Sequence, residues 1–269
     1  MENIQNMVAK VAVVTGSSNG IGLATARLLY QKGWIVYGLD VVPSNSDALT
    51  KSFVIDVIDS TAVKTAVDTI LETHKHIDVL VANAGQSYTG AVEKVNIELA
   101  KLVFDANFFG QVYCINAVIP TMREYGGTII CVGSIAGSIA PPFLAFYNAA
   151  KAAVESFAKS VRAELEPFGI KVSVVIPGIV KTKITQNRIK DFQDNDEIYG
   201  DRIKNTIDTL EKKEATADDA TQVAKTIYKI VNVSHPKPTY TVGATAKATL
   251  FANNVLPNAV TEIVGTFTK

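Results

Sequence analysis

Short apolar runs alternate with longer amphipathic stretches along most of this chain. The first run, residues 10–15, is β-branched and apolar at successive positions, which predicts a strand covered on both faces. Residues 21–32 carry apolar side chains at helical spacing and are followed by Gly33, which predicts a helix and its end. A second apolar run at residues 34–40 completes a βαβ unit.

The same alternation continues toward the C-terminus. Further strands are expected at residues 53–55, 77–82, 128–132, 171–176 and 238–242, and helices at residues 60–73, 99–124, 147–167 and 217–231. This order predicts an α/β fold, a Rossmann-type doubly wound parallel sheet of about seven strands with helices on both faces. No repeat or linker divides the chain, so a single domain is expected over residues 1–269.

Two segments depart from the alternation. Residues 181–214 are polar and charge-rich, with weak helical periodicity over residues 199–210. They follow the carboxyl end of a strand, where ligands bind in α/β sheets, and we interpret them as a substrate lid. A pair of solvated surface helices is the alternative. From residue 247 onward the chain is apolar and is expected to be irregular.

Composition narrows the possible functions. The chain has 269 residues, of which 48% are hydrophobic and 19% charged, so it has enough apolar surface to fold. The 26 basic and 26 acidic residues leave no net charge, and such a chain lacks the field that binds nucleic acid. Cys114 and Cys131 lie in apolar runs and are expected to be buried, and no Cys/His spacing suggests a metal.

Targeting signals are not expected. Residues 1–6 lack a basic region followed by a long apolar one, so they do not resemble a signal peptide. No run approaches the roughly 18 apolar residues of a spanning helix. A cytoplasmic protein without a membrane span is the expectation.

A glycine-rich turn, Thr-Gly-Ser-Ser-Asn-Gly-Ile-Gly at residues 15–22, joins the first strand to the first helix. Glycines permit a tight turn, close approach of backbone to a pyrophosphate and close helix–strand packing, while the helix N-terminus offers N–H groups to the phosphates. The placement between strand and helix is the context that a dinucleotide site requires. The candidate contacts here are Gly16, Ser18, Asn19, Gly20, Ile21 and Gly22.

Asp40 ends the second strand and predicts NAD as the cofactor. A carboxylate at this place accepts hydrogen bonds from the adenine ribose. It also repels a 2′-phosphate, by about 4 kcal/mol at ~4 Å and an effective dielectric of ~20. Asn19 and residues 41–43 bring no basic side chain that would favour NADP. A strand-end Asp that only caps the loop is the alternative.

Two later strand ends add candidate contacts. Asp56, with the backbone of Val57, is placed to hydrogen-bond the adenine amino group, although helix capping is nearly as good an interpretation. Asn83, Ala84 and Gly85 follow the next strand, where the small residues leave room for a ribose or nicotinamide.

Ser134, Tyr147 and Lys151 form a candidate catalytic set. Tyr147 and Lys151 are four residues apart and share one face of a predicted helix. A tyrosine of ordinary pKa near 10 is a poor base, and a nearby ammonium lowers that pKa. Ser134 is placed to hold the substrate oxygen toward the phenol, so Ser134 and Tyr147 are also the candidate substrate contacts. Lys151 is also placed to bind the nicotinamide ribose, so Tyr147 and Lys151 are candidate cofactor contacts as well.

These motifs, taken in order with Pro177 and Gly178, resemble the short-chain dehydrogenase/reductase family over residues 8–182. The resemblance implies a single Rossmann domain with a seven-stranded sheet. It implies a fourth catalytic residue, Asn107, that holds a water leading from the lysine to solvent. It implies that Pro177, Gly178, Val180 and Thr182 wrap the nicotinamide, and that the helices of Asn107 and Tyr147 form a homodimer or homotetramer.

The substrate is expected to be a small molecule, a hydrophobic secondary alcohol or ketone. Its walls should come from residues 86–90, 137–145 and 179–214, of which residues 138–144 are distinctly apolar. The C-terminal pattern faintly resembles the hydroxysteroid and retinol dehydrogenase branch. An NADP-dependent ketone reductase and a non-enzymatic NAD sensor are the alternatives.

Overall fold

The computed structural model describes residues 9–182, 184, 187–193, 195–217 and 219–265. The first six residues, judged above for a signal peptide, lie outside this part. So do four residues of the predicted lid, at positions 183, 185, 186 and 194.

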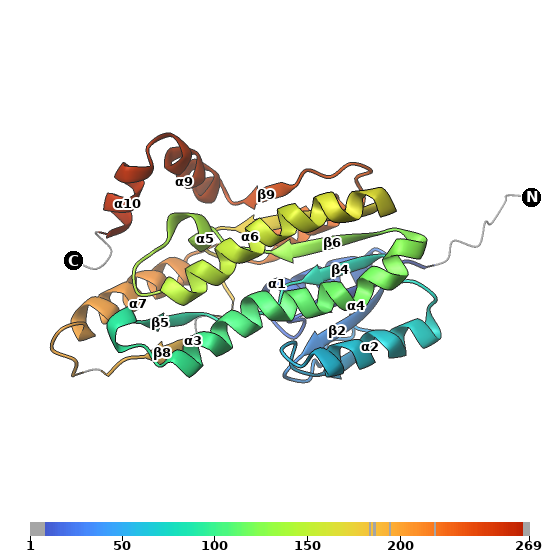
Figure 1. The fold of residues 1–269 in the computed structure, drawn as a ribbon, viewed down its shortest axis with the longest axis horizontal. Coiled ribbons are helices and arrows are strands. Elements are labelled where there is room, and N and C mark those ends of the chain that lie inside the picture. Colours follow the sequence, from blue (N-terminus) through green and yellow to red (C-terminus); the bar gives the residue numbers. More distant parts are fainter. Residues whose placement is uncertain (1–8, 183, 185–186, 194, 218, 266–269) are drawn as a thin grey trace, which may run out of the picture.

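Seven strands form one parallel sheet in the order β3-β2-β1-β4-β6-β7-β9 (Figure 1). Their bounds are β1 (Val11–Thr15), β2 (Ile35–Asp40), β3 (Lys51–Val54), β4 (Val79–Ala82), β6 (Gly127–Val132), β7 (Ile170–Pro177) and β9 (Thr239–Val242). The predicted α/β fold is therefore confirmed. The strand expected at residues 53–55 begins at Lys51 instead, because its exposed side chains obscure the apolar signal.

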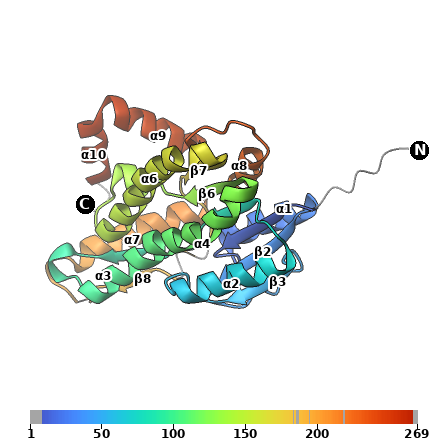
Figure 2. The ribbon, with the colours of Figure 1, turned by 45° about the vertical axis from the view of Figure 1, so that its right-hand side comes forward.

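Helices cover both faces of the sheet (Figures 1 and 2). On one face lie α2 (Ser60–Thr73), α4 (Gly110–Tyr125) and α6 (Ala145–Leu165), and on the other α1 (Gly20–Gln31) and α8 (Thr221–Val231). Successive residues of β1 serve the two cores, since Val13 packs on the first face and Val14 on the second. This alternation explains why the central strands are apolar at every position.

The helix expected at residues 99–124 is longer and interrupted. It runs through α3 (Ile97–Phe104), a π-helical turn at Asp105–Phe109, and α4. By length and composition alone the stretch Ile97–Tyr125 is long and apolar enough to span a membrane. Its apolar residues are interspersed with polar ones, and α4 packs on α2, β4 and β6 as a core helix does.

Several elements were not predicted. Strands β5 (Tyr88–Gly90) and β8 (Ile189–Asp191) pair in parallel as a second small sheet. By contrast, α7 (Gly200–Ala215) lies where residues 199–210 showed weak helical periodicity. Short helices occur at α5 (Ala136–Ile139), Val92–Lys94 and Glu166–Phe168.

The expectation of an irregular C-terminus was wrong. Residues 244–265 form α9 (Ala244–Val255) and α10 (Pro257–Gly265), which pack against α5 (Figure 1). In α9 only Ala246 is buried. The sequence of α9 therefore lacks the repeated apolar spacing that predicts an amphipathic helix.

Candidate active site

The glycine-rich turn is shaped to accept a phosphate. Gly20 has φ +52° and a side chain there would meet Thr182, while a Cβ on Gly22 would lie 2.1 Å from the carbonyl oxygen of Gly16. Within the described part of the chain, the N-cap Asn19 makes no side-chain cap and the first turn of α1 has no acidic residue. The N–H groups of that turn are thus open to an anion.

Asn83 fastens the end of β4 to this turn. Its side-chain Nδ2 donates to the carbonyl oxygen of Thr15 at 2.9 Å, and its backbone N–H donates to the Thr15 hydroxyl at 2.9 Å. The N–H of Ala84 donates to the same hydroxyl at 2.9 Å. Sequence reasoning missed this structural role of Asn83, because it depends on strands 68 residues apart becoming neighbours.

Asp40 lies where β2 ends and is 8% exposed. Its two carboxylate oxygens accept hydrogen bonds from the N–H of Ser18 at 2.9 Å and of Val42 at 3.2 Å. Each oxygen has a second lone pair for a further donor. The carboxylate therefore stabilises the glycine-rich turn and can still accept hydrogen bonds from a ligand bound beside that turn.

Asp56 and Val57 lie at the end of β3. The Asp56 carboxylate is exposed and accepts from the N–H of Ile58 at 3.1 Å, whereas Val57 packs its side chain against Gly110. The alternative that Asp56 caps the next helix is wrong, because Asp59 accepts from the first N–H groups of α2 instead.

The carboxyl ends of the strands open into a cavity of about 800 Å³. All four candidate catalytic residues line it. So do nine of the candidate cofactor contacts, namely Ile21, Asn83, Gly85, Tyr147, Lys151, Pro177, Gly178, Val180 and Thr182. The remaining candidates, Gly16, Ser18, Asn19, Gly20, Gly22, Asp40, Asp56, Val57 and Ala84, do not line it.

Tyr147 is buried and faces Ser134. Burial raises the pKa of Tyr147, while a hydrogen bond with Ser134 and the positive charge of Arg188 lower it. Glu214 raises the same pKa. The protein thus keeps the phenol protonated and supplies two groups that favour its ionisation.

Lys151 lies one turn further along α6. Its Nζ is 5.8 Å from the ring centroid of Tyr147 and donates to the carbonyl oxygen of Val132 at 3.1 Å. Burial lowers the pKa of Lys151 to about 8. A buried ammonium of this kind exchanges its proton easily near neutral pH.

Asn107 is fully buried within the π-helical turn. Its Nδ2 donates to the carbonyl oxygens of Gln86 at 2.7 Å and Val103 at 2.8 Å, and among the described residues its Oδ1 has no hydrogen-bond donor. A Cβ on Gly85 would lie 2.4 Å from that Oδ1 and 3.6 Å from Lys151 Nζ. The amide oxygen and the ammonium therefore converge beside Gly85, and π turns are frequent at such functional places.

The cavity walls are mostly apolar. The expected segments contribute Ser87, Ile139, Pro141 and Leu144, and the predicted lid contributes Ile184, Arg188, Leu210 and Glu214. Val260 and Ile263 of α10 were missed, because nothing local links the C-terminus to residue 134.

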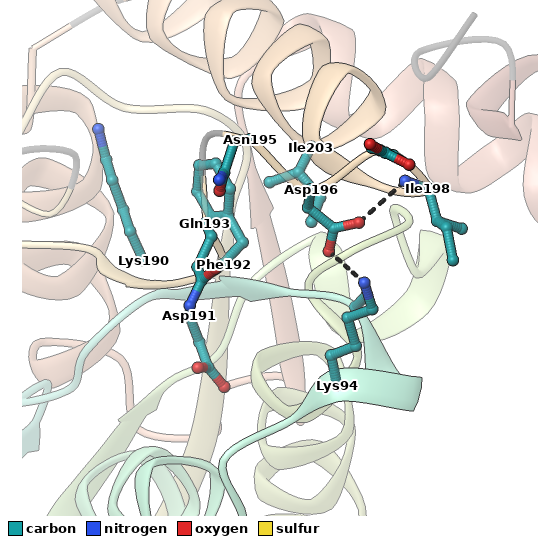
Figure 3. A pocket seen from close by; sticks show the side chains of 11 residues that line it. Lys94, Lys190, Asp191, Phe192, Gln193, Asn195, Asp196, Ile198 and Ile203 are labelled. Atoms are coloured by element: carbon teal, nitrogen blue, oxygen red, sulfur yellow. Dashed lines mark hydrogen bonds and ion pairs between the residues drawn. The ribbon is translucent and has the colours of Figure 1, made fainter.

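A second hollow of about 630 Å³ lies beside β8 (Figure 3). Its lining is polar and includes Asp196, which accepts from Lys94 Nζ at 2.7 Å and from the N–H of Ile198 at 2.9 Å. None of the candidate catalytic residues lines it. The larger cavity is the candidate site on chemical grounds. In the part of the chain that is described, no cluster of three His, Cys, Asp or Glu side chains suits a metal.

Comparison with known proteins agrees with this geometry. Residues 10–193 match the family model described as short chain dehydrogenase. A 3-ketodihydrosphingosine reductase of Bacteroides thetaiotaomicron is 36% identical over 86% of each chain. Two solved short-chain dehydrogenases share the fold at 22% identity. One from Burkholderia phymatum with NAD has a TM-score of 0.80 and covers 92% of this chain and 93% of its own. One from Burkholderia cenocepacia with NADP has a TM-score of 0.73 and covers 95% and 97%.

The chain belongs to the short-chain dehydrogenase/reductase family. It is an oxidoreductase of the class that acts between CH–OH and keto groups, and its fold is one that binds a nicotinamide cofactor.

Proposed function

We propose that this protein is an NAD(H)-dependent oxidoreductase that interconverts a hydrophobic secondary alcohol and its ketone. The observation that carries the proposal is the convergence of Ser134, Tyr147 and Lys151 on one apolar cavity beside the glycine-rich turn. A relative whose name specifies a keto group and a reductase supports the same reaction class.

The residues present fit a dinucleotide. The open first turn of α1 would hold the phosphates, and Asn83 to Gly85 with Pro177 to Thr182 would border the nicotinamide. When bound, the nicotinamide would supply or accept the hydride. Gly22 and Gly85 keep these places free, since a side chain at either would collide with Gly16 or Asn107.

The protein's own residues handle the proton. Ser134 would hold the substrate oxygen beside the hydroxyl of Tyr147, which gives its proton to the ketone or takes one from the alcohol. Lys151 would stabilise the phenolate electrostatically. The unpartnered Oδ1 of Asn107 would hold a water beside Lys151, through which the proton reaches solvent.

The same proposal extends to the lid and the oligomer. Residues 181–214 would act as the lid. The pairing of β8 with β5 and the hydrogen bond from Lys94 to Asp196 join this segment to the rest of the protein. A homodimer or homotetramer through the helices of Asn107 and Tyr147 is favoured by Leu102 and Phe109, two large apolar residues exposed near Asn107.

Asp40 should select NADH over NADPH. We expect the wild-type protein to bind NADH about 100-fold more tightly than NADPH, because a 2′-phosphate would lie against the carboxylate. Asp40→Asn should narrow this ratio to less than about tenfold. The measurement is a titration of purified protein with each dinucleotide, followed by nicotinamide fluorescence.

Asp47→Asn is the matched control, since Asp47 is an exposed carboxylate on the loop after β2. It should leave the ratio at the wild-type value, and thermal melting of Asp40→Asn checks that the turn survives. Tighter binding of NADPH by the wild type would make the NADP-dependent reductase the better assignment and reduce Asp40 to a loop cap.

A further inference from the structure

The active-site cavity contains a buried ion pair whose charges act on the pKa of Tyr147 but which gives or takes no proton itself. Arg188 and Glu214 both line it, and Arg188 Nη2 lies 2.8 Å from Glu214 Oε1. Their side chains are only 2% and 13% exposed. Removing a charge pair from water gives little or no net stability compared with apolar residues of similar size, so stability alone does not explain an ion pair in this wall.

The fold brings together the ion pair and its neighbour Ser87 from three segments of the chain. The pairing of β5 with β8 sets Tyr88 opposite Ile189, which places Ser87 beside Arg188. Glu214 comes from α7, one turn after Leu210, and both face the cavity. Leu210 also packs in the same apolar cluster as Tyr147. Arg188 is therefore held near the reacting end of the cavity.

One of the three guanidinium nitrogens of Arg188 has no hydrogen-bond acceptor among the described residues. Its Nε donates to the hydroxyl of Ser87 at 3.3 Å and its Nη2 donates to Glu214. Among the described residues its Nη1 finds no acceptor, although it is buried. A buried donor without an acceptor is costly. Because Arg188 lies in the cavity wall, a ligand oxygen that reaches Nη1 would satisfy this donor.

Charge decides what kind of acceptor fits. Glu214 is paired with Arg188, and Lys213 and Asp219 add one charge of each sign to the cavity wall. Lys151 adds a positive charge beside Tyr147. A carboxylate or phosphate bound to Arg188 would lie near Glu214, whose repulsion offsets the attraction of the guanidinium. A neutral oxygen accepts the hydrogen bond without that repulsion.

We propose that Arg188 binds a second, uncharged oxygen of the substrate, a hydroxyl or carbonyl set apart from the reacting carbon on an otherwise apolar chain. This rests on the function proposed above and narrows the substrate class to hydroxy ketones and diketones. Glu214 and Ser87 are the positioning residues that orient the guanidinium.

The test compares four ketones of equal chain length. One is hexyl methyl ketone, and the other three carry, away from the reacting carbonyl, a second keto group (the diketone), a hydroxyl (the hydroxy ketone) or a carboxylate (the keto acid). With NADH, the wild type should show a higher kcat/KM for the diketone or hydroxy ketone than for the other two. In the double variant Arg188→Leu/Glu214→Leu, which leaves no buried charge unpaired, the ratio of oxygenated to plain ketone should fall about 10- to 100-fold, mainly through KM. Arg27→Leu, an exposed arginine of α1, is the control and should keep the ratio.

Binding is measured separately, so that failure of the proposed function can be told apart. The Tyr147→Phe protein loaded with NADH is titrated with the same four compounds, with and without the double substitution. Loss of the preference for the oxygenated ligand supports the role of Arg188 even if no ketone is turned over. Should the double variant melt early, Arg188→Lys replaces it, because an ammonium cannot reproduce the guanidinium fork.

Three results would overturn the proposal. One is a wild type that binds or reduces the plain ketone as well as the oxygenated ones. Another is a preference for the keto acid. The third is an equal loss for all ketones with a shifted pH profile, which would mean that Arg188 acts only on the ionisation of Tyr147.

Discussion

Replacing Tyr147 with phenylalanine is expected to lower kcat by about a thousandfold while the protein still binds NADH. The phenol hydroxyl is the buried acid that Ser134 hydrogen-bonds at the cavity wall, and general acid–base catalysis contributes about 10²- to 10⁴-fold. The ring itself packs with Leu144 and Tyr88 and is retained in phenylalanine. Steady-state kinetics with a ketone and NADH, together with an NADH fluorescence titration, measure both effects.

The control for this variant is Tyr125→Phe, which removes a hydroxyl from an exposed tyrosine at the end of α4. It should leave kcat unchanged. A Tyr147→Phe protein with near wild-type kcat would remove Tyr147 from the mechanism, and one that no longer binds NADH would make the residue structural.

Replacing Lys151 with methionine should abolish most activity and change how stability depends on pH. Burial lowers the pKa of Lys151 from 10.5 to about 8, so between these values the unfolded chain binds more protons than the folded protein. The wild type is therefore penalised fully below about pH 8, and the penalty disappears as the pH rises through 10.5. Relative to Lys151→Met, the free energy of unfolding of the wild type should increase by about 3 kcal/mol across this window.

Urea denaturation of both proteins at several pH values measures this difference, and common effects of alkaline pH cancel in it. Lys159→Met is the matched control, since Lys159 is an exposed lysine of the same helix. Its difference from the wild type should stay within about 0.5 kcal/mol. If the difference in free energy of unfolding between the wild type and Lys151→Met does not change with pH, the ammonium is solvated and burial does not lower its pKa.

The candidate cofactor contacts could be predicted from the sequence because the patterns that mark them are local. The glycine spacing, Asp40 after β2 and the small residues after β4 are each set by a turn that the neighbouring strand and helix impose. The two hydrogen bonds that occupy Asp40 were not readable. They depend on how the glycine-rich turn and the loop after β2 fold around one carboxylate.

The Arg188–Glu214 pair shows the opposite case. Residues 181–214 looked only polar and charge-rich, because few of their described residues are buried. These are Arg188, just before β8, and Gly200, Ile203, Thr206 and Ile207 of α7. Which charges turn inward was decided by the pairing of β5 with β8, a contact about 100 residues apart in the sequence.

The sequence by itself determined the parallel sheet, its covering helices and the candidate set Ser134, Tyr147 and Lys151. Continuous apolar runs have few alternatives to strands buried on both faces, and a four-residue spacing places two side chains on one helical face. Only the tertiary structure decided what shares the cavity with them. The π turn that buries Asn107, the inward ion pair and the cover from α10 arise from packing between distant segments, for which no local pattern of residues exists.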